Sequence, residues 1–184
     1  MNKFTNMKLL SSWWRWDVFL SEINWIKYAI KKAKDNSKKW AIKKEITILK
    51  YLKWKVNFVP QIEDFWEDFF MYKFIEWTTL NKIKNPPKIV YKQLVEYAYI
   101  LDSLHVEHWE LSKPTKNIIV NNTNNVFIID FERWNLSNYN AKNLKWISRF
   151  LLKEKIINLE TIINLNKKWN IEEIKKYLLE KLNN

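Results

Sequence analysis

Residues 105–133 constrain the fold more than any other part of the chain. Two runs rich in β-branched and apolar residues, 118–120 and 126–129, flank the polar segment 121–125. The asparagines and threonine of that segment tolerate the backbone geometry of a turn, whereas the flanking residues favour extended strands. The pattern therefore predicts a β-hairpin.

The predicted hairpin carries oxygen-bearing side chains at one end. Folding it about Thr123 is expected to bring Asn117 beside Asp130, because antiparallel partners lie equally far from the turn. Amide and carboxylate oxygens are hard ligands that suit Mg²⁺ carrying phosphates. We therefore take Asn117 and Asp130 as candidate metal ligands. For this stretch alone, the alternative is an ordinary hairpin flanked by a loop.

The same residues carry a family resemblance. The ordered motifs H-x-[DE]-L, N-I-I and I-I-D-F resemble the catalytic loop and metal-binding aspartate of the protein kinase superfamily. The short chain, and D-F-E in place of D-F-G, look most similar to the small archaeal RIO-like and KEOPS-type serine/threonine kinases.

The resemblance implies a role for each polar residue of this stretch. Glu110 stands where the family has its catalytic aspartate, Asn117 where it has the second-metal asparagine, and Asp130 where it has the principal Mg²⁺ ligand. Lys113 would neutralise charge that develops in the transition state. This chain differs from the family in having glutamate as the base, and in a longer spacing from that base to the asparagine.

Tryptophan stands where glycine is expected. The chain has no glycine and 12 tryptophans, whereas average usage of roughly 7% would give about 13 glycines in a chain this long. Trp25, Trp54, Trp66 and Trp169 all fall at predicted turns or helix ends, where glycine is favoured. We interpret the chain as a glycine-containing protein whose glycines have been replaced, or recorded, as tryptophan. The functions expected from the motifs are those of this glycine-containing parent. The alternative to replacement is a natural, tryptophan-rich chain whose indoles fill a core.

With glycine restored at its tryptophans, the segment 9–20 resembles the kinase glycine-rich loop. Ser11 then takes the first glycine place, Trp13 and Trp16 take the second and third, and Val18 is the valine that covers adenine. Glycine suits this loop because backbone N–H groups must approach the β- and γ-phosphates without an intervening Cβ. The alternative is a glycine-rich turn without a function.

The next strand and helix supply a predicted ion pair. Residues 26–31 alternate like a strand and place Ala29 and Lys31 on one face. They resemble the kinase V-A-I-K strand, so Ala29 would lie against adenine and Lys31 would hold the α- and β-phosphates. Glu45 shares a helix face with the apolar Ile42, and the resemblance supplies Lys31 as its partner. The alternative for Lys31 is that it belongs to a solvated basic run, and the alternative for Glu45 is an exposed position at the edge of the apolar stripe.

The remaining segments complete the expected order of elements. Residues 74–80 resemble the interlobe hinge, where main-chain groups near Phe74 would hydrogen-bond adenine and Tyr72 would be the gatekeeper. We also expect strands at 56–62 and 69–74, and helices at 88–104, 144–153, 159–168 and 171–182.

Together these patterns predict an α+β chain with a minimal, two-lobed protein-kinase-like fold. Residues 1–76 would form a small antiparallel sheet with one helix. Residues 77–184 would form a mostly helical lobe that contains the catalytic loop 108–117 and the metal site at Asp130.

Composition excludes several classes of protein. Without cysteine there is no disulfide and no cysteine-ligated zinc or iron–sulfur centre. Residues 1–8 lack an apolar signal region and no run of 18 apolar residues occurs, so we expect a cytoplasmic location and no membrane partner. The net charge of +12 favours polyanionic partners: ATP, an acidic protein or a nucleic acid.

The expected function is ATP- and Mg²⁺-dependent phosphotransfer to serine or threonine of a protein substrate. A second class is a pseudokinase or nucleotide-binding scaffold, which would bind nucleotide without turnover. A third is a basic, aromatic-rich nucleic-acid binder. Tryptophans spread singly over turns, rather than clustered on a basic face, argue against the third class.

Overall fold

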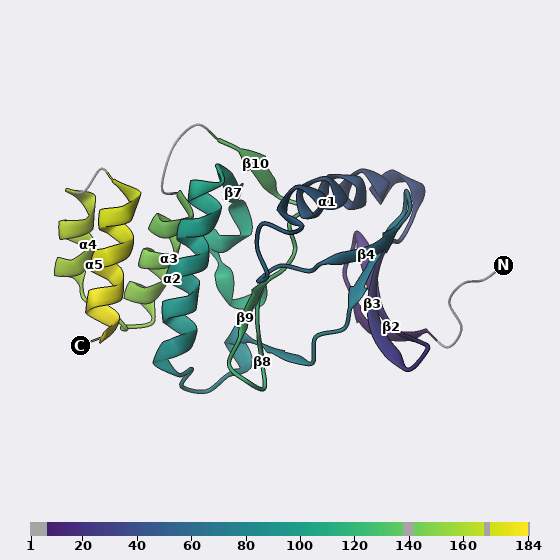
Figure 1. Cartoon of the computed structure of the whole chain (residues 1–184), viewed down its shortest axis with the longest axis horizontal. Helices are drawn as coiled ribbons and strands as arrows, with labels where there is room; N and C mark the ends of the chain where they lie inside the picture. Colours follow the sequence, from purple (N-terminus) through teal and green to yellow (C-terminus); the bar gives the residue numbers. More distant parts are fainter. Residues whose placement is uncertain (1–6, 138–141, 168–169, 184) are drawn as a thin grey trace. The chain divides into compact units, whose positions relative to one another are not determined.

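A computed structural model of the chain describes residues 7–137, 142–167 and 170–183 (Figure 1). The fold is α+β, with antiparallel sheets and five α-helices among these residues. Its internal contacts divide the chain into two compact units. The first unit comprises Met1–Glu76 with Asp130–Glu132, and the second comprises Trp77–Ile129 with Arg133–Asn184. The D-F-E segment, expected to belong with the later residues, is therefore grouped with the first unit.

The first unit is a five-stranded antiparallel sheet with one α-helix. Along the sheet the strands follow the order β1-β2-β3-β5-β4. The helix α1, Lys39–Leu52, packs against three of them. The strands are β1 Lys8–Ser12, β2 Trp16–Ile23, β3 Ile26–Ala33, β4 Ile62–Phe65 and β5 Phe69–Lys73.

The strand register gathers the predicted nucleotide-side residues on one face of this sheet. Val18 of β2 lies opposite Lys31 of β3, and Ala29 of β3 lies opposite Tyr72 of β5. Side chains alternate between faces with a period of two, and directly opposed residues share a face. Val18, Ala29, Lys31 and Tyr72 therefore project from the same side, as the sequence pattern predicted for Ala29 and Lys31.

The helix α1 buries one stripe against the sheet. Ile42, Ile46 and Leu49 are all buried, and each such side chain contributes about 1.5 to 3 kcal/mol of transfer free energy. Glu45 falls within the same stripe and is only 2% exposed. The helical period of about 3.6 residues therefore places the Glu45 carboxylate in the core of the first unit. A buried carboxylate requires a partner there.

The prediction of a strand beginning at residue 56 is wrong. Strand β4 begins at Ile62, and the residues before it form a loop that buries Phe58 and Val59. Pro60 removes a backbone donor from that loop. The Gln61 side chain also donates from Nε2 to the carbonyl oxygens of the loop at 2.9 and 3.2 Å, which satisfies groups that a sheet ladder would otherwise have used.

The second unit combines helices with two small sheets. Helix α2 lies beside α3 and α5, and the hairpin β8–β9 extends into a three-stranded sheet through β6 (Figure 1). The helices are α2 Lys88–Ser103, α3 Lys142–Lys153, α4 Leu159–Asn166 and α5 Ile171–Asn183. The strands are β6 Trp77–Thr79, β7 Val106–His108, β8 Ile118–Asn121, β9 Val126–Ile128 and β10 Trp134–Leu136.

A buried aspartate fixes the start of α3 against the end of α2. Asp102 accepts hydrogen bonds from the backbone N–H of Asn143, the Asn143 side chain and the backbone N–H of Leu144, at 3.1, 2.8 and 2.9 Å. The two backbone donors have no partner inside the helix, because the first turn leaves its N–H groups free. Burial raises the pKa of Asp102 to about 6.

Most tryptophans lie at the surface rather than in the core. Trp16 is the only one in the buried core of the residues that the structure describes. Trp25 and Trp54 are 93% and 89% exposed, and both have a positive φ, of 66° and 69°. This conformation suits glycine. The predicted turn at Trp66 joins β4 to β5, and Trp169 lies outside the described residues.

The two strained tryptophans occupy different turn types. Asn24 and Trp25 both have positive φ and join β2 to β3 as a two-residue turn, whose second position favours glycine. Trp54 follows Lys53, which has φ −54° and ψ 132°, and the backbone N–H of Lys55 donates to Leu52 O at 3.0 Å. That is a type II turn, which requires positive φ at its third residue.

We expect Trp25→Gly and Trp54→Gly each to stabilise the protein by about 0.5 to 1 kcal/mol, since relief of left-handed strain exceeds the added entropy of the unfolded chain. Trp146→Gly, within helix α3, is the matched control. It should destabilise by about 1 kcal/mol or more, because glycine is a poor helix former and the half-buried indole loses its packing. Chemical denaturation measures all three. Equal destabilisation at the turn sites and at Trp146 would contradict the strain argument.

Candidate functional site

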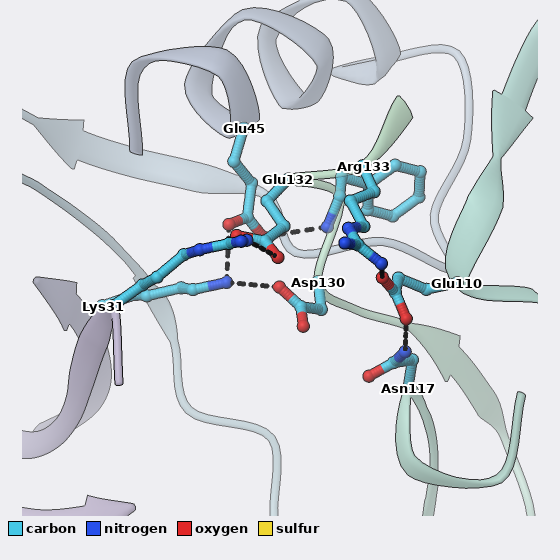
Figure 2. A network of polar contacts seen from close by, with 9 residues as sticks. Lys31, Glu45, Glu110, Asn117, Asp130, Glu132 and Arg133 are labelled. Carbon is cyan, nitrogen blue, oxygen red and sulfur yellow. Dashed lines mark hydrogen bonds and ion pairs between the residues drawn. The ribbon is translucent and has the colours of Figure 1, made fainter. Parts of the chain in front are cut away.

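Lys31 is the centre of a charged network in the first unit (Figure 2). Its Nζ donates to Glu45 Oε2 at 2.6 Å and to Asp130 Oδ1 at 2.8 Å. Strand β3 supplies the lysine, helix α1 supplies Glu45, and the D-F-E segment supplies Asp130. The structure therefore brings together three of the residues singled out in the sequence, including the Lys31–Glu45 pair.

When its three groups are ionised, the network carries one more negative than positive charge. Burial by itself lowers the pKa of Lys31, but Asp130 and Glu45 raise it above its ordinary value, so the ammonium stays charged. Burial raises the pKa of Glu45 to about 7, although Lys31 opposes this. Asp130 is the more accessible carboxylate, with a side chain 23% exposed. It is thus the group at which a divalent cation could offset the excess charge.

The backbone of the D-F-E segment is held in a fixed conformation. Asp130 has a positive φ of 66°, which is uncommon for a residue with a side chain. The next backbone N–H, of Phe131, donates to Glu45 Oε1 at 3.1 Å, and the Phe131 ring is fully buried. Unusual backbone conformations persist where surrounding contacts fix them, and they cluster at functional sites.

The residues expected to contact adenine surround the same sheet face. Val18 and Ala29 lie beside Lys31 and Tyr72 through the strand register, and burial raises the pKa of Tyr72 to about 12. Phe74 follows β5, and its backbone N–H donates to Lys27 O at 2.8 Å. That N–H is therefore already used within the sheet and is not available to an adenine ring.

The turn between β1 and β2 places an indole beside Lys31. Trp13 is exposed, and its backbone N–H donates to Trp16 O at 2.9 Å across the turn. The Trp16 side chain is buried, with its ring centroid 3.9 Å from Lys31 Nζ. Such a cation–π contact is favourable when desolvated. The indole occupies space next to the ammonium on the face that also carries Val18.

The second unit holds the residues expected to act on the attacking hydroxyl. Asn117 Nδ2 donates to Glu110 Oε2 at 3.3 Å, and Arg133 Nη1 lies 3.4 Å from Glu110 Oε1 (Figure 2). With Nδ2 as the donor, the Asn117 side-chain oxygen remains the group that could accept a cation. Lys113 contacts Glu110 through its backbone N–H at 3.1 Å, and its side chain is exposed.

The hairpin register differs by one residue from the predicted pairing. Ile118 lies opposite Ile128, and the backbone N–H of Ile129 donates to Asn117 O at 2.9 Å. The partner of Asn117 is therefore Ile129, and Asp130 is the next residue along the chain. Equal distance from Thr123 in fact specifies this pairing, so the expected Asn117–Asp130 pairing was a miscount.

Sequence reasoning missed two contacts. His108 is fully buried, and its Nε2 lies 3.1 Å from Ile129 O, at the end of β9. Arg15 Nη1 donates to Glu132 Oε1 at 2.6 Å in the first unit. Burial raises the pKa of Glu132, while Arg15 lowers it. The only sequence signal for the second contact was the glutamate of D-F-E in a place where the family has glycine.

Comparisons with known proteins add no family to this geometry. No model of a protein family matches the chain, and no curated protein sequence matches it. Across the ranges that the structure describes, no cluster of three or more histidine, cysteine or acidic residues could hold a metal ion by itself. Within the same ranges no helix has both the length and the apolar character needed to cross a bilayer.

Lys31→Met tests the energetic role of the network. We expect it to destabilise the protein by about 3 to 5 kcal/mol, because it leaves two carboxylates without their buried cation. Adding Glu45→Leu should recover part of the loss, since the most buried uncompensated charge is then removed. The control is Lys32→Met, which alters an exposed lysine 3.9 Å from Asp68 and should change stability by about 0.5 kcal/mol or less. Urea denaturation of these proteins and of the Glu45→Leu single variant decides, and additive effects of the two core substitutions would contradict the coupling.

Proposed function

We propose that the chain, with glycine at its tryptophan positions, is an ATP- and Mg²⁺-dependent phosphotransferase of the minimal protein-kinase type. Serine or threonine of a protein is the proposed acceptor, and the cytoplasm is the proposed location. The observation that supports this most directly is the contact of one ammonium, Lys31 Nζ, with both Glu45 and Asp130. A kinase uses the same three groups to set the phosphates and the metal.

Each candidate residue of the two units has a distinct task in this proposal. Glu45 holds the Lys31 ammonium in place, and Lys31 in turn binds phosphate oxygens. Asp130 and Asn117 offer the carboxylate and amide oxygens that suit Mg²⁺. When bound, Mg²⁺ neutralises charge on the phosphates. Glu110 orients the attacking hydroxyl and accepts its proton.

A nucleotide-binding scaffold without turnover is the second candidate. It is favoured by the surroundings of Glu110, whose two carboxylate oxygens already contact Asn117 and Arg133. A carboxylate whose oxygens are already engaged is less available to a substrate hydroxyl as a proton acceptor. Nucleotide binding with no measurable phosphotransfer would select this candidate over the first.

We propose that glycine occupies the tryptophan positions of the natural protein. The exposure of Trp25 and Trp54, with their positive φ, supports this, since large aromatic side chains are normally well buried. The coding DNA and the intact mass of the protein isolated from its source would decide. One shared codon at all twelve positions and a mass with twelve glycines would support the proposal, and a mass with twelve indoles would refute it.

Asp130→Ala should abolish phosphotransfer in the glycine-containing chain, with a loss of roughly a hundredfold or more. It should also remove the dependence of ATP affinity on Mg²⁺, because the proposed principal metal ligand is lost. Asp68→Ala removes a carboxylate at the edge of the same unit and should leave both quantities unchanged. Isothermal titration with and without Mg²⁺, alongside a phosphotransfer assay, separates the outcomes. Full activity in the Asp130 variant would disprove the metal assignment.

Trp16→Gly should strengthen ATP binding by about tenfold or more, because it removes the indole beside Lys31 and the Cβ from the turn. Trp13→Gly changes the same turn at an exposed side chain and should have a smaller effect. Titration with ATP, and with adenosine as the ligand that lacks phosphates, measures the difference. An equal gain for adenosine would show that the indole does not obstruct phosphate in particular.

A further inference from the structure

A second ion pair joins the β1–β2 turn to the D-F-E segment. Arg15 lies in the turn, and Glu132 is the last residue of D-F-E; their side chains are 17% and 7% exposed. The contact spans 117 residues of sequence and lies within the first unit. Glu132 therefore places a buried negative charge on the turn that corresponds to the proposed phosphate-binding loop.

Both partners are held by their backbones. The N–H of Lys34 donates to Arg15 O at 3.1 Å, which ties the turn to the end of β3. Glu132 directly follows Phe131, whose N–H is bound by Glu45. Rings of Trp14 and Trp40 lie 4.8 and 5.5 Å from the guanidinium carbon. The ion pair therefore joins two segments whose backbones are fixed by other hydrogen bonds.

The ion pair leaves hydrogen-bonding capacity unused. Among the residues that the structure describes, Arg15 Nε and Glu132 Oε2 are buried and have no hydrogen-bond partner. A guanidinium and a carboxylate can form two parallel bonds, and here only one is made. Arg15 therefore retains a buried donor that a second anion could engage, which a complete bidentate pair would not offer.

The charge of the surrounding cluster opposes an incoming anion. Three carboxylates, Glu45, Asp130 and Glu132, face two cations, Lys31 and Arg15, so the ionised cluster has one excess negative charge. A polyphosphate would be repelled by Glu132 and attracted by Arg15. Removing the carboxylate charge of Glu132 would both end the repulsion and free the guanidinium.

We propose that Glu132 acts as an internal competitor of polyphosphate for Arg15, so that nucleotide binding requires exchange of the carboxylate for phosphate oxygens on the guanidinium. In the ligand-free chain the carboxylate keeps the β1–β2 turn against the D-F-E segment. When polyphosphate binds, Arg15 transfers to it and the Glu132 charge is released. This regulation of access rests on the proposed function, because it concerns the same phosphate site.

The experiment compares inorganic tripolyphosphate, ATP and adenosine as ligands of the full chain with glycine at its tryptophan positions, which is the parent of the variants below. Glu132→Gln keeps the side-chain shape and should raise affinity for tripolyphosphate and ATP about tenfold, while leaving adenosine unchanged. Glu22→Gln, which removes an exposed carboxylate on β2, controls for net charge and should have little effect. In a chain that already carries Arg15→Gln, the further change Glu132→Gln should give a much smaller gain, because only the direct repulsion is then relieved and no guanidinium is released.

The outcomes separate this inference from the proposed function. Weaker or unchanged tripolyphosphate binding in a folded Glu132→Gln variant overturns the competition, even if the parent chain binds ATP and transfers phosphate. A gain for tripolyphosphate without any phosphotransfer supports the competition and counts against the kinase assignment. If the parent chain binds neither ATP nor tripolyphosphate, both the competition and the proposed function are overturned. Circular dichroism establishes that each variant is folded before binding is compared.

Discussion

A buried ammonium requires a partner of opposite charge, and the first unit supplies two such partners to Lys31. Burial alone would lower the pKa of the lysine, and two carboxylates raise it above its ordinary value. Strand β3, helix α1 and the D-F-E segment are thereby held at a common point, although 99 residues separate Lys31 from Asp130. The grouping of Asp130–Glu132 with the first unit follows from this electrostatic demand together with burial of the Phe131 ring.

The same demand gives the site its chemical character. Glu45 is enclosed and serves the lysine, whereas Asp130 is partly accessible and retains an oxygen beyond the one bonded to Nζ. Glu45 therefore stabilises the Lys31 ammonium, whereas Asp130 is open to a ligand that also contacts this ammonium. In the proposed function, phosphate and Mg²⁺ together would replace these contacts with equivalent ones.

Local patterns predicted the elements better than the contacts between them. The period of two in β3 and the apolar stripe of α1 specified which faces Lys31 and Glu45 occupy, because both patterns are set by the backbone itself. The start of β4 at Ile62 was missed since the bonds of Gln61 belong to a loop with no periodic signal. The Arg15–Glu132 contact could not be read from the sequence, because the glutamate of D-F-E marks an unusual residue but does not specify Arg15 as its partner.

Trp25 and Trp54 occupy backbone positions that favour glycine on physical grounds. An indole is favoured in a fold when its large apolar surface is covered, yet Trp25 and Trp54 expose almost all of it and require a left-handed backbone as well. Neither position gains from the side chain it carries, and both would gain from having none. Trp16 is the opposite case, since its ring is buried and favourably placed against Lys31. The Trp16–Lys31 contact favours folding but would obstruct the proposed polyphosphate ligand. A change from tryptophan to glycine should therefore relieve strain at Trp25 and Trp54, and at Trp16 it should open the charged network around Lys31.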